Sequence, residues 1–153
     1  MFREPVFDAP YTRALRWRTD ADNDTLVRWT TNAARAAWPL IEWPASIPPA
    51  EAAFTAWQFA RECVRYQRED GDQLIRMPWR TLADGVGDCK SLAVLVASLC
   101  AAAGRKVELR FVTFSGEDWF GHVYAIVDNL PIDPELEFCD EVQYISRLDR
   151  RIR

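Results

Sequence analysis

The chain has 153 residues, of which 49% are hydrophobic and 12% aromatic, so it can bury a core of ordinary size and is not expected to be disordered. Its 23 acidic and 19 basic side chains give a net charge of -4, which leaves no basic field to neutralise a phosphate backbone. Nucleic acid is therefore not an expected partner.

Two further features bear on where the protein acts: the N-terminal segment and the longest apolar run. Residues 1–10 contain charged side chains and lack the apolar run of a signal peptide. The longest apolar run, residues 92–103, is shorter than the roughly 18 residues that a membrane span needs. We therefore expect a cytoplasmic location without membrane association. The C-terminal basic cluster is short and interrupted, which is typical of a solvated tail; it comprises Arg147, Arg150, Arg151 and Arg153.

Helical patterns fill the first part of the chain. A first helix is expected over residues 24–38 and a second over 50–69, with Pro49 in its first turn and Gly71 beyond its end. The proline-punctuated stretch 39–49 between them is too short to be a domain linker. Apolar side chains at three-to-four spacing predict the buried face of the second helix: Phe54, Trp57, Phe59, Ala60 and Val64, with Cys63 as a further candidate.

A buried helix is expected near the middle of the chain. Residues 72–88 contain one proline and two glycines and are predicted to form a loop that leads into it. The helix should begin at Asp88 or Cys89, run to residue 103 and stop at Gly104. It is apolar on nearly every side after its first three residues, which predicts a central helix with only its first turn near solvent.

The hydrophobic period changes to two from Val107, which predicts a half-buried strand. After a break over residues 115–118, further strands are expected over 121–127, 131–133 and 142–147. Because the helices precede an antiparallel sheet, this order predicts an α+β fold.

Cys89 is expected on the first turn of the central helix, directly after Gly85-Val86-Gly87-Asp88. Unpaired N–H groups and the helix dipole favour a thiolate at such a position, and the same N–H groups can stabilise an oxyanion. A lone cysteine at a helix start is also commonly a small buried hydrophobe. Partner residues are needed before it predicts a nucleophile.

His122 is the one histidine of the chain and lies on the strand expected over residues 121–127. If that strand turns through Asp128-Asn129 as a two-residue hairpin, Asp133 falls on the face of His122, within side-chain reach. A three-residue turn would put Asp133 on the opposite face.

An acid beside the imidazole would hold its tautomer and leave the other ring nitrogen to accept the proton of Cys89. Asp133 is the preferred acid. Asp128 and Asp118 are the alternatives, although Asp128 sits in the turn itself and Asp118 precedes His122 by only four residues.

The four cysteines show no Cys-x-x-Cys spacing and accompany a single histidine, so neither a metal site nor a cofactor is expected. In an intracellular chain we expect all of them to be thiols: Cys63, Cys89, Cys100 and Cys139.

An ordered set of motifs runs from about Gln73 to Asp133: Arg76-Met77-Pro78, Gly87-Asp88-Cys89 before an apolar helix, Gly104, Gly121-His122-Val123-Tyr124 and Pro131-Ile132-Asp133-Pro134. This set resembles the papain-like core of the transglutaminase-like superfamily in its compact bacterial and bacteriophage form. The resemblance implies that Cys89 is the nucleophile, His122 its base and Asp133 the orienting acid. It also implies one domain over residues 1–153, with an N-terminal segment over 1–49 and the catalytic core over 50–153.

Three neighbouring residues are candidates for oxyanion or substrate contacts. Asp88 and Lys90 flank Cys89 in the sequence. Compact microbial members often carry a second acid at the position of Lys90. An ammonium there would favour thiolate and change which substrate is accepted. Trp79 is the candidate for the upstream oxyanion donor through its indole N–H, and a plain packing role for it is equally open.

The resemblance implies cysteine-dependent acyl transfer on a peptide or protein amide, through an acyl-thioester that water or an amine resolves. Hydrolysis is preferred to transamidation because the chain lacks the extra domains that control acyl acceptors in large transglutaminases. The rival hypothesis is a binding or assembly module, such as a phage accessory protein, that keeps the fold without turnover. Its docking surface would draw on the seven tryptophans, five of which lie at or before residue 57.

Overall fold

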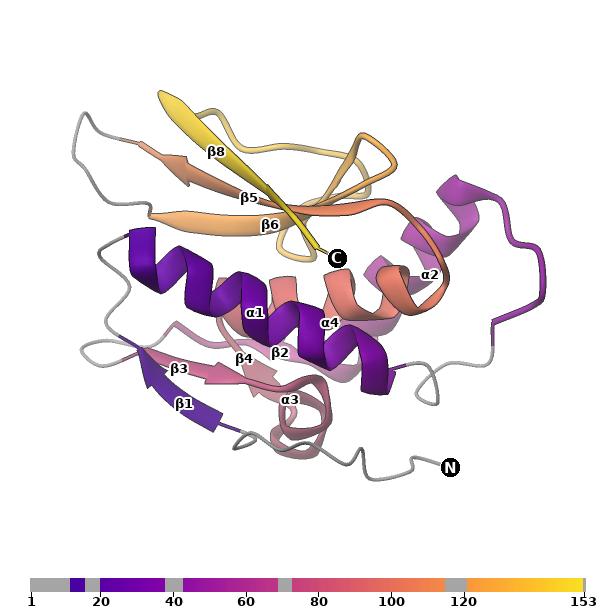
Figure 1. Ribbon diagram of the computed structural model, residues 1–153, viewed down its shortest axis with the longest axis horizontal. Coiled ribbons are helices and arrows are strands. Elements are labelled where there is room, and N and C mark those ends of the chain that lie inside the picture. Colours follow the sequence, from indigo (N-terminus) through magenta and orange to yellow (C-terminus); the bar gives the residue numbers. More distant parts are fainter. Residues whose placement is uncertain (1–11, 16–19, 38–42, 69–72, 115–120, 153) are drawn as a thin grey trace.

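The computed structural model describes residues 12–15, 20–37, 43–68, 73–114 and 121–152. It confirms the α+β prediction, with the elements arranged in three layers (Figure 1). The helices are α1 (Asp20–Ala37), α2 (Pro49–Cys63), α3 (Pro78–Asp84) and α4 (Cys89–Ala102). A four-stranded antiparallel sheet has the order β7 (Leu130–Ile132), β6 (His122–Val127), β5 (Val107–Thr113) and β8 (Ser146–Arg151).

Two small sheets lie on the opposite side of the helices (Figure 1). In one, β1 (Thr12–Leu15) pairs antiparallel with β3 (Gln73–Arg76). In the other, β2 (Arg65–Tyr66) pairs parallel with β4 (Val86–Gly87), immediately before α4. The segment that leads into α4 is thus held by β2, a strand from the first half of the sequence.

Helix α4 is the central element, as its apolar composition predicts. Every residue from Cys89 to Cys100 is buried, and the helix packs against α1, α2 and the strands β5 and β6. The first turn is less accessible than expected, because Cys89 is 8% exposed, while Ala101 and Ala102 at the other end are partly exposed. Gly104 follows with φ 77°, the left-handed conformation that ends a helix.

The Leu95→Ala variant should lose about 2–5 kcal/mol of unfolding free energy, because Leu95 is fully buried and alanine would leave a cavity. Phe54→Ala is the matched control: this aromatic side chain is 42% exposed and should cost less. Urea unfolding followed by tryptophan fluorescence measures both. Equal losses would contradict a core centred on α4.

Helix α2 differs from its prediction in length and in its buried face. Pro49 lies in its first turn as expected, but the helix ends at Cys63 and not at residue 69, because the chain becomes extended at Val64 and pairs with β4. The buried residues of the helix are small, Ala52, Ala53, Ala56 and Ala60, of which only Ala60 belongs to the predicted stripe. Trp57 and Phe59 pack against the core and Val64 is buried, as predicted, whereas Cys63 is exposed. Phe54 lies outside the core, where its ring packs edge-on against Phe138 at 5.2 Å.

Residues 73–88, the described part of the predicted loop over 72–88, are not a loop. They contain β3, α3 and β4. Pro78 occupies the first turn of α3, and Gly85, with φ 65°, ends that helix. The proline and the glycine thus mark the two ends of a short helix rather than an irregular connection.

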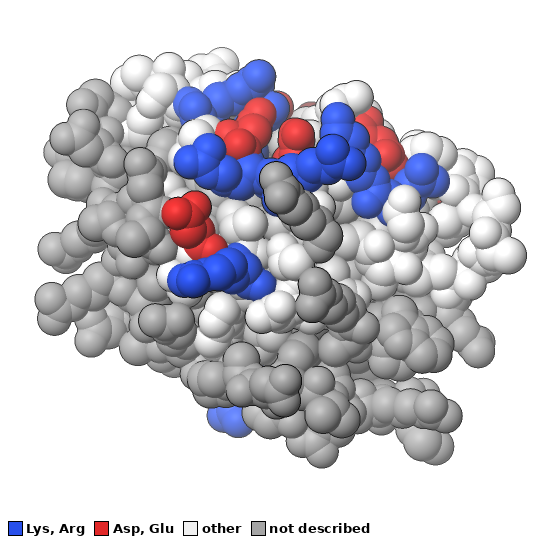
Figure 2. Space-filling model, viewed as in Figure 1, with Lys and Arg blue, Asp and Glu red and all other residues white. Residues whose placement is uncertain are grey.

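Three arginines of the C-terminal cluster, Arg147, Arg150 and Arg151, lie in an edge strand and not in a solvated tail, and this last strand lies later than the expected 142–147. Strand β8 pairs with β5, with Leu148 opposite Phe111. Arg110 on β5 forms a bidentate pair with Asp149 at 2.8 and 3.0 Å. Basic and acidic atoms intermingle over the upper part of the molecule in Figure 2, where this sheet lies in the same view. Such charges discourage further strand pairing at an edge.

Some predictions concern residues outside the described part of the chain: the N-terminal segment 1–10, Gly71, the break at 115–118 with Asp118, and Arg153. Within the described part, none of the helices has both the length and the apolar character that a membrane span requires.

Candidate active site

Cys89 is the first residue of α4, and Asp88 caps the helix. One carboxylate oxygen of Asp88 accepts hydrogen bonds from the backbone N–H groups of Lys90 at 3.0 Å and Ser91 at 3.3 Å. The Asp88 carbonyl accepts the N–H of Leu92 at 3.0 Å. These bonds occupy the other N–H groups of the first turn. The N–H group of Cys89 remains, and within the described part of the chain neither the helix nor its cap uses it as a hydrogen-bond donor.

Gly87 lets the chain approach α4 closely. A side chain at this position would place its Cβ 3.0 Å from the Cβ of Ser91. Gly87 is also fixed from the other side, because its carbonyl accepts the N–H of Gln67 at 2.9 Å. The segment that positions Cys89 is therefore held between α4 and the residues around β2.

Asp88 and Lys90 form a buried ion pair. Asp88 is 3% and Lys90 1% exposed, and the ammonium of Lys90 contacts the carboxylate oxygen of Asp88 that does not cap the helix. Both charges thus have a partner inside the protein. This placement favours a structural role at the helix start for the two residues over direct contact with a substrate.

Trp79 is half-buried in the first turn of α3 and packs against the core cluster around α4. This contact gives it a packing role. Its indole N–H as an oxyanion donor stays a prediction.

The turn between β6 and β7 has the predicted two residues. Asp128 and Asn129 have φ 47° and 69°, the left-handed values of a type I′ hairpin, and Val127 pairs with Leu130. Asp128 itself lies 3.0 Å from the guanidinium of Arg105, so its carboxylate is engaged there.

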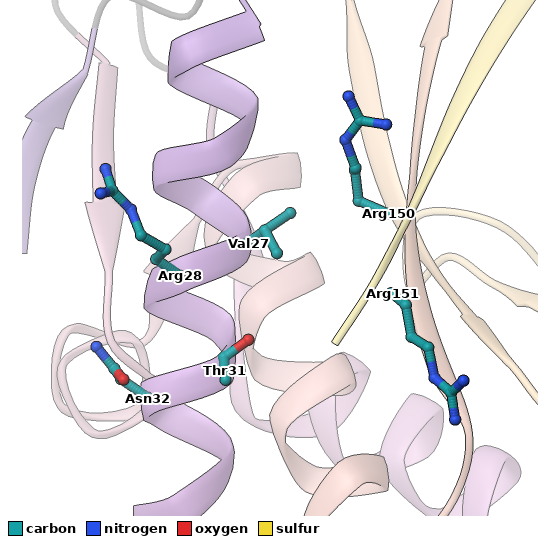
Figure 3. A pocket seen from close by; sticks show the side chains of 6 residues that line it. All are labelled: Val27, Arg28, Thr31, Asn32, Arg150 and Arg151. Carbon is teal, nitrogen blue, oxygen red and sulfur yellow. The ribbon is translucent and has the colours of Figure 1, made fainter. Parts of the chain in front are cut away.

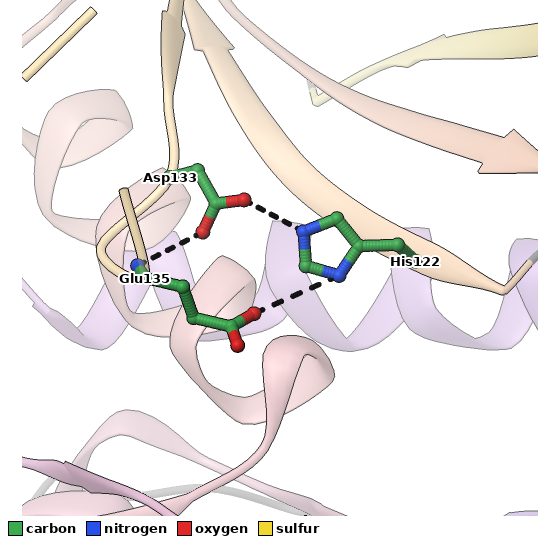
Figure 4. Close-up of side chains that lie close together, drawn as sticks. All are labelled: His122, Asp133 and Glu135. Atoms are coloured by element: carbon green, nitrogen blue, oxygen red, sulfur yellow. Dashed lines mark hydrogen bonds and ion pairs between the residues drawn. The ribbon is translucent and has the colours of Figure 1, made fainter. Parts of the chain in front are cut away.

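This register brings Asp133 to the imidazole of His122. The Oδ2 atom of Asp133 lies 2.6 Å from Nε2 of His122 (Figure 4). The other carboxylate oxygen accepts the backbone N–H of Glu135 at 3.0 Å, so the acid is held on both sides. His122 is 8% and Asp133 3% exposed, and a short hydrogen bond between such groups is strong.

Cys89 is the second partner of the imidazole. Burial lowers the pKa of His122. Hydrogen bonds with Asp133 and Cys89 and the negative charge of both groups outweigh this effect and raise the pKa to about 10. Because Nε2 faces Asp133, Nδ1 is the nitrogen left for Cys89. The ring is therefore protonated at neutral pH and can return a proton through Nδ1.

The pKa of His122 predicts a pH dependence of stability. A group whose pKa rises from 6.5 to about 10 on folding stabilises the protein fully below pH 6.5, and this contribution is lost as the pH rises through 10. The unfolding free energy of the wild type should therefore fall toward that of His122→Gln over this interval, by up to about 1.4 kcal/mol per pH unit. Urea titrations of both proteins measure it. Parallel pH curves would contradict the charged imidazole.

Glu135 is a site residue that the sequence reading missed. Its Oε2 atom lies 3.7 Å from Nδ1 of His122, the nitrogen that Asp133 does not occupy (Figure 4). The signal available was a second acid two residues after Asp133, in the segment that follows β7. No spacing rule singled it out, because its position depends on the path of the chain beyond the strand.

His122, Asp133 and Glu135 are also close enough together to be considered as metal ligands. Ligand atoms of His122, Asp133 and Glu135 lie within 4.8 Å of one another. Nε2 of His122 and Oδ2 of Asp133 already bind each other at 2.6 Å, which orients the ring. The arrangement therefore suits an oriented imidazole better than a cation site.

Two hollows adjoin the described helices. One, of about 400 Å³, lies beside Glu135 and the first turns of α4, where Leu92 forms part of its wall. The other, of about 460 Å³, lies between α1 and β8 and is lined by Val27, Arg28, Thr31, Asn32, Arg150 and Arg151 (Figure 3). Its lining contains neither a cysteine nor a histidine. The lining of the first hollow also contains neither, but Leu92 belongs to the turn of α4 that Cys89 begins, and Glu135 lies 3.7 Å from Nδ1 of His122.

The structure therefore has a papain-like α+β fold with a cysteine at the start of its central helix. The family model of the transglutaminase-like superfamily matches residues 43–129, more than half of the chain, so the protein belongs to this superfamily. The match contains Cys89 and His122 and ends before Asp133. At this coarse level the chain is related to cysteine-dependent enzymes.

A comparison with curated proteins finds no match. Among solved structures, the chain is similar to a candidate cysteine protease from Cytophaga hutchinsonii, with 13% identity and a TM-score of 0.43. The similarity covers 80% of this chain and 39% of that one, so this chain spans well under half the length of that protein.

Proposed function

We propose that this protein is a cysteine-dependent acyl-transfer enzyme that acts on amide bonds of a peptide or protein. The observation that carries the proposal is the imidazole of His122, which binds Asp133 at 2.6 Å through Nε2 and has its pKa raised by hydrogen bonding with Cys89. Superfamily membership supports it.

In the proposed reaction Nδ1 of His122 takes the proton of Cys89, and the resulting thiolate attacks the amide carbonyl, whose oxygen gains the negative charge. The Cys89 N–H, which the helix cap leaves unused, is the first donor to this oxyanion, and the indole of Trp79 is the candidate for the second. His122 gives its Nδ1 proton to the leaving amine, and an acyl-thioester results. The imidazole then takes a proton from the second nucleophile, which attacks the thioester and releases Cys89. Asp133 keeps the ring oriented throughout.

Water is the second nucleophile that we favour, so the proposed activity is that of a peptidase or amidase rather than a transglutaminase. No step calls for a cofactor. We also propose one domain over residues 1–153 and a bacterial or bacteriophage-encoded protein that acts in the cytoplasm, with cell-wall peptides or virion proteins as the substrates in view.

The alternative is a binding or assembly module that keeps the fold without turnover. The low exposure of Cys89, 8%, is the observation that favours it. Reactivity of this thiol separates the two hypotheses.

Iodoacetamide at neutral pH should alkylate Cys89 much faster than the other three cysteines. Cys63 is exposed, but burial and the charge of Glu62 raise its pKa, so it is accessible without being activated. Burial likewise raises the pKa of Cys139, and that of Cys100 to about 12. Accessibility alone predicts that Cys63 reacts first, whereas pairing with His122 predicts Cys89. Peptide mass spectrometry after short pulses measures the order. Protection of Cys89 in the folded protein would support the binding-module alternative.

A further inference from the structure

The carboxylate of Glu135 lies on the reacting side of His122. It is 3.7 Å from Nδ1, the nitrogen that Asp133 does not occupy and that exchanges protons with the leaving and entering groups in the proposed reaction. The side chain of Glu135 is 26% exposed, so it is partly open to solvent. Whatever amine or acyl group approaches Cys89 from this side passes the carboxylate.

The loop that carries Glu135 is firmly held. The guanidinium of Arg61 on α2 donates to the carbonyls of Pro134 at 3.2 Å and Leu136 at 2.9 Å. The indole of Trp57 donates to the same Leu136 carbonyl at 3.0 Å. Glu135 is thus presented from a fixed backbone, and the nearby cation of Arg61 is already engaged with backbone carbonyls.

The hollow of about 400 Å³ beside this loop pairs the carboxylate with a partly apolar wall. It is lined by Arg61, Val64, Tyr66, Leu92, Pro134 and Glu135. Tyr66 in its wall pairs with Gly87, two residues before Cys89, and Leu92 lies on the first turn of α4, so the hollow adjoins the segment that carries the thiol. An alkyl chain fits such a wall, and a positive end group fits the carboxylate.

Two carboxylates flank the imidazole of His122, and the guanidinium of Arg61 is a cation in the lining of the hollow. The ammonium of Lys90 is buried against Asp88. The single positive charge of His122 is shared between Asp133 at 2.6 Å and Glu135 at 3.7 Å. Burial raises the pKa of Glu135, which means that its charged form lacks full compensation from the protein. A cationic group of a substrate would supply that compensation.

We propose that Glu135 is a specificity-determining residue that binds an ammonium group of the substrate in the hollow beside Cys89. The inference rests on the proposed function and narrows its substrate class to amides that carry a free amine close to the scissile bond, such as a lysine-type side chain or a free α-amino group. Anionic amides are disfavoured by the same carboxylate.

Charge-selective labelling of Cys89 tests the proposal without knowledge of the substrate. Three methanethiosulfonates are used: the cationic 2-aminoethyl, the neutral propyl of nearly the same size, and the anionic 2-sulfonatoethyl reagents. Rates at Cys89 are measured by quenched mass spectrometry at neutral pH, with Cys63 as the internal reference. The cation should react at least about tenfold faster than the anion, and Glu135→Gln should reduce this ratio by about tenfold. Glu137→Gln, which removes the same charge from an exposed position of the same segment, should leave the ratio unchanged.

A second measurement uses fluorogenic peptide amides that differ only in lysine or norleucine next to the scissile bond. Glu135→Gln should lower kcat/KM for the lysine peptide by about tenfold more than that for the norleucine peptide, whereas Glu137→Gln should leave the ratio of the two values unchanged. An unaltered labelling ratio in Glu135→Gln, or an equal fall in Glu137→Gln, would overturn the proposal. Uniformly slow labelling that keeps the charge order would contradict the proposed thiol chemistry and support the role of Glu135. Fast labelling without a charge order would do the reverse.

Discussion

Replacing Cys89 by alanine should lower turnover of a fluorogenic peptide-amide library by about 10⁴-fold or more, to the background of the assay. The sulfur is the atom that forms the acyl-thioester, and no described residue near His122 offers a second thiol. The melting temperature should change little, because the lost side chain is small and lies at the helix start, where Asp88 and not Cys89 provides the cap.

His122→Ala tests whether Cys89 and His122 act together in catalysis. Residues that act as one unit lose their effect together, so this variant and the double variant with Cys89→Ala should be as inactive as the cysteine variant alone. Additive losses would show that the two side chains act separately. An unchanged rate in Cys89→Ala would remove the thiol mechanism.

Lys90→Met should lower the free energy of unfolding by about 3–5 kcal/mol, because it leaves the carboxylate of Asp88 buried without a cation. Urea unfolding measures the loss. The double variant Asp88→Asn with Lys90→Met should recover much of it, since asparagine still caps a helix and the buried charge is gone. A loss of under about 1 kcal/mol in Lys90→Met would mean that the Asp88 charge is solvated or compensated elsewhere.

The sequence predicts the local features of the site well. The apolar run after Cys89 indicates a central helix, and the parity of a two-residue turn at Asp128-Asn129 puts Asp133 beside His122. Both features depend on residues that are neighbours in the sequence. They can be predicted because a helix and a hairpin each have a fixed geometric period.

Elements whose partners are distant in the sequence escape such reasoning. Strands β2 and β4 have two residues each and no period, and they exist because Arg65 and Tyr66 meet Val86 and Gly87. The charged sequence of β8 resembles a tail, and its pairing with β5 becomes visible only in the fold. Phe54 matches the apolar stripe of α2, yet the small side chains of that helix form its buried face.

The site residues likewise divide into those that the sequence predicts and those that only the fold brings together. The roles of Cys89, His122 and Asp133 can be proposed from order and spacing, whereas Glu135 enters because the chain turns back after β7 and brings its carboxylate to Nδ1. Lys90 shows the opposite case. It adjoins Cys89 in the sequence, but its side chain is buried against Asp88.

The central claim is that His122 activates Cys89 to form an acyl-thioester, and acylation by p-nitrophenyl acetate tests it most directly. Wild type, Cys89→Ala, His122→Ala and Cys63→Ser are incubated with the ester at neutral pH, quenched in acid and mapped by peptide mass spectrometry. The account predicts an acetyl group on Cys89 in the wild type and in Cys63→Ser, its absence in Cys89→Ala, and acetylation slowed by orders of magnitude in His122→Ala. Acetylation of Cys89 at the wild-type rate in His122→Ala, or acetyl groups on Cys63 in preference to Cys89, would contradict it.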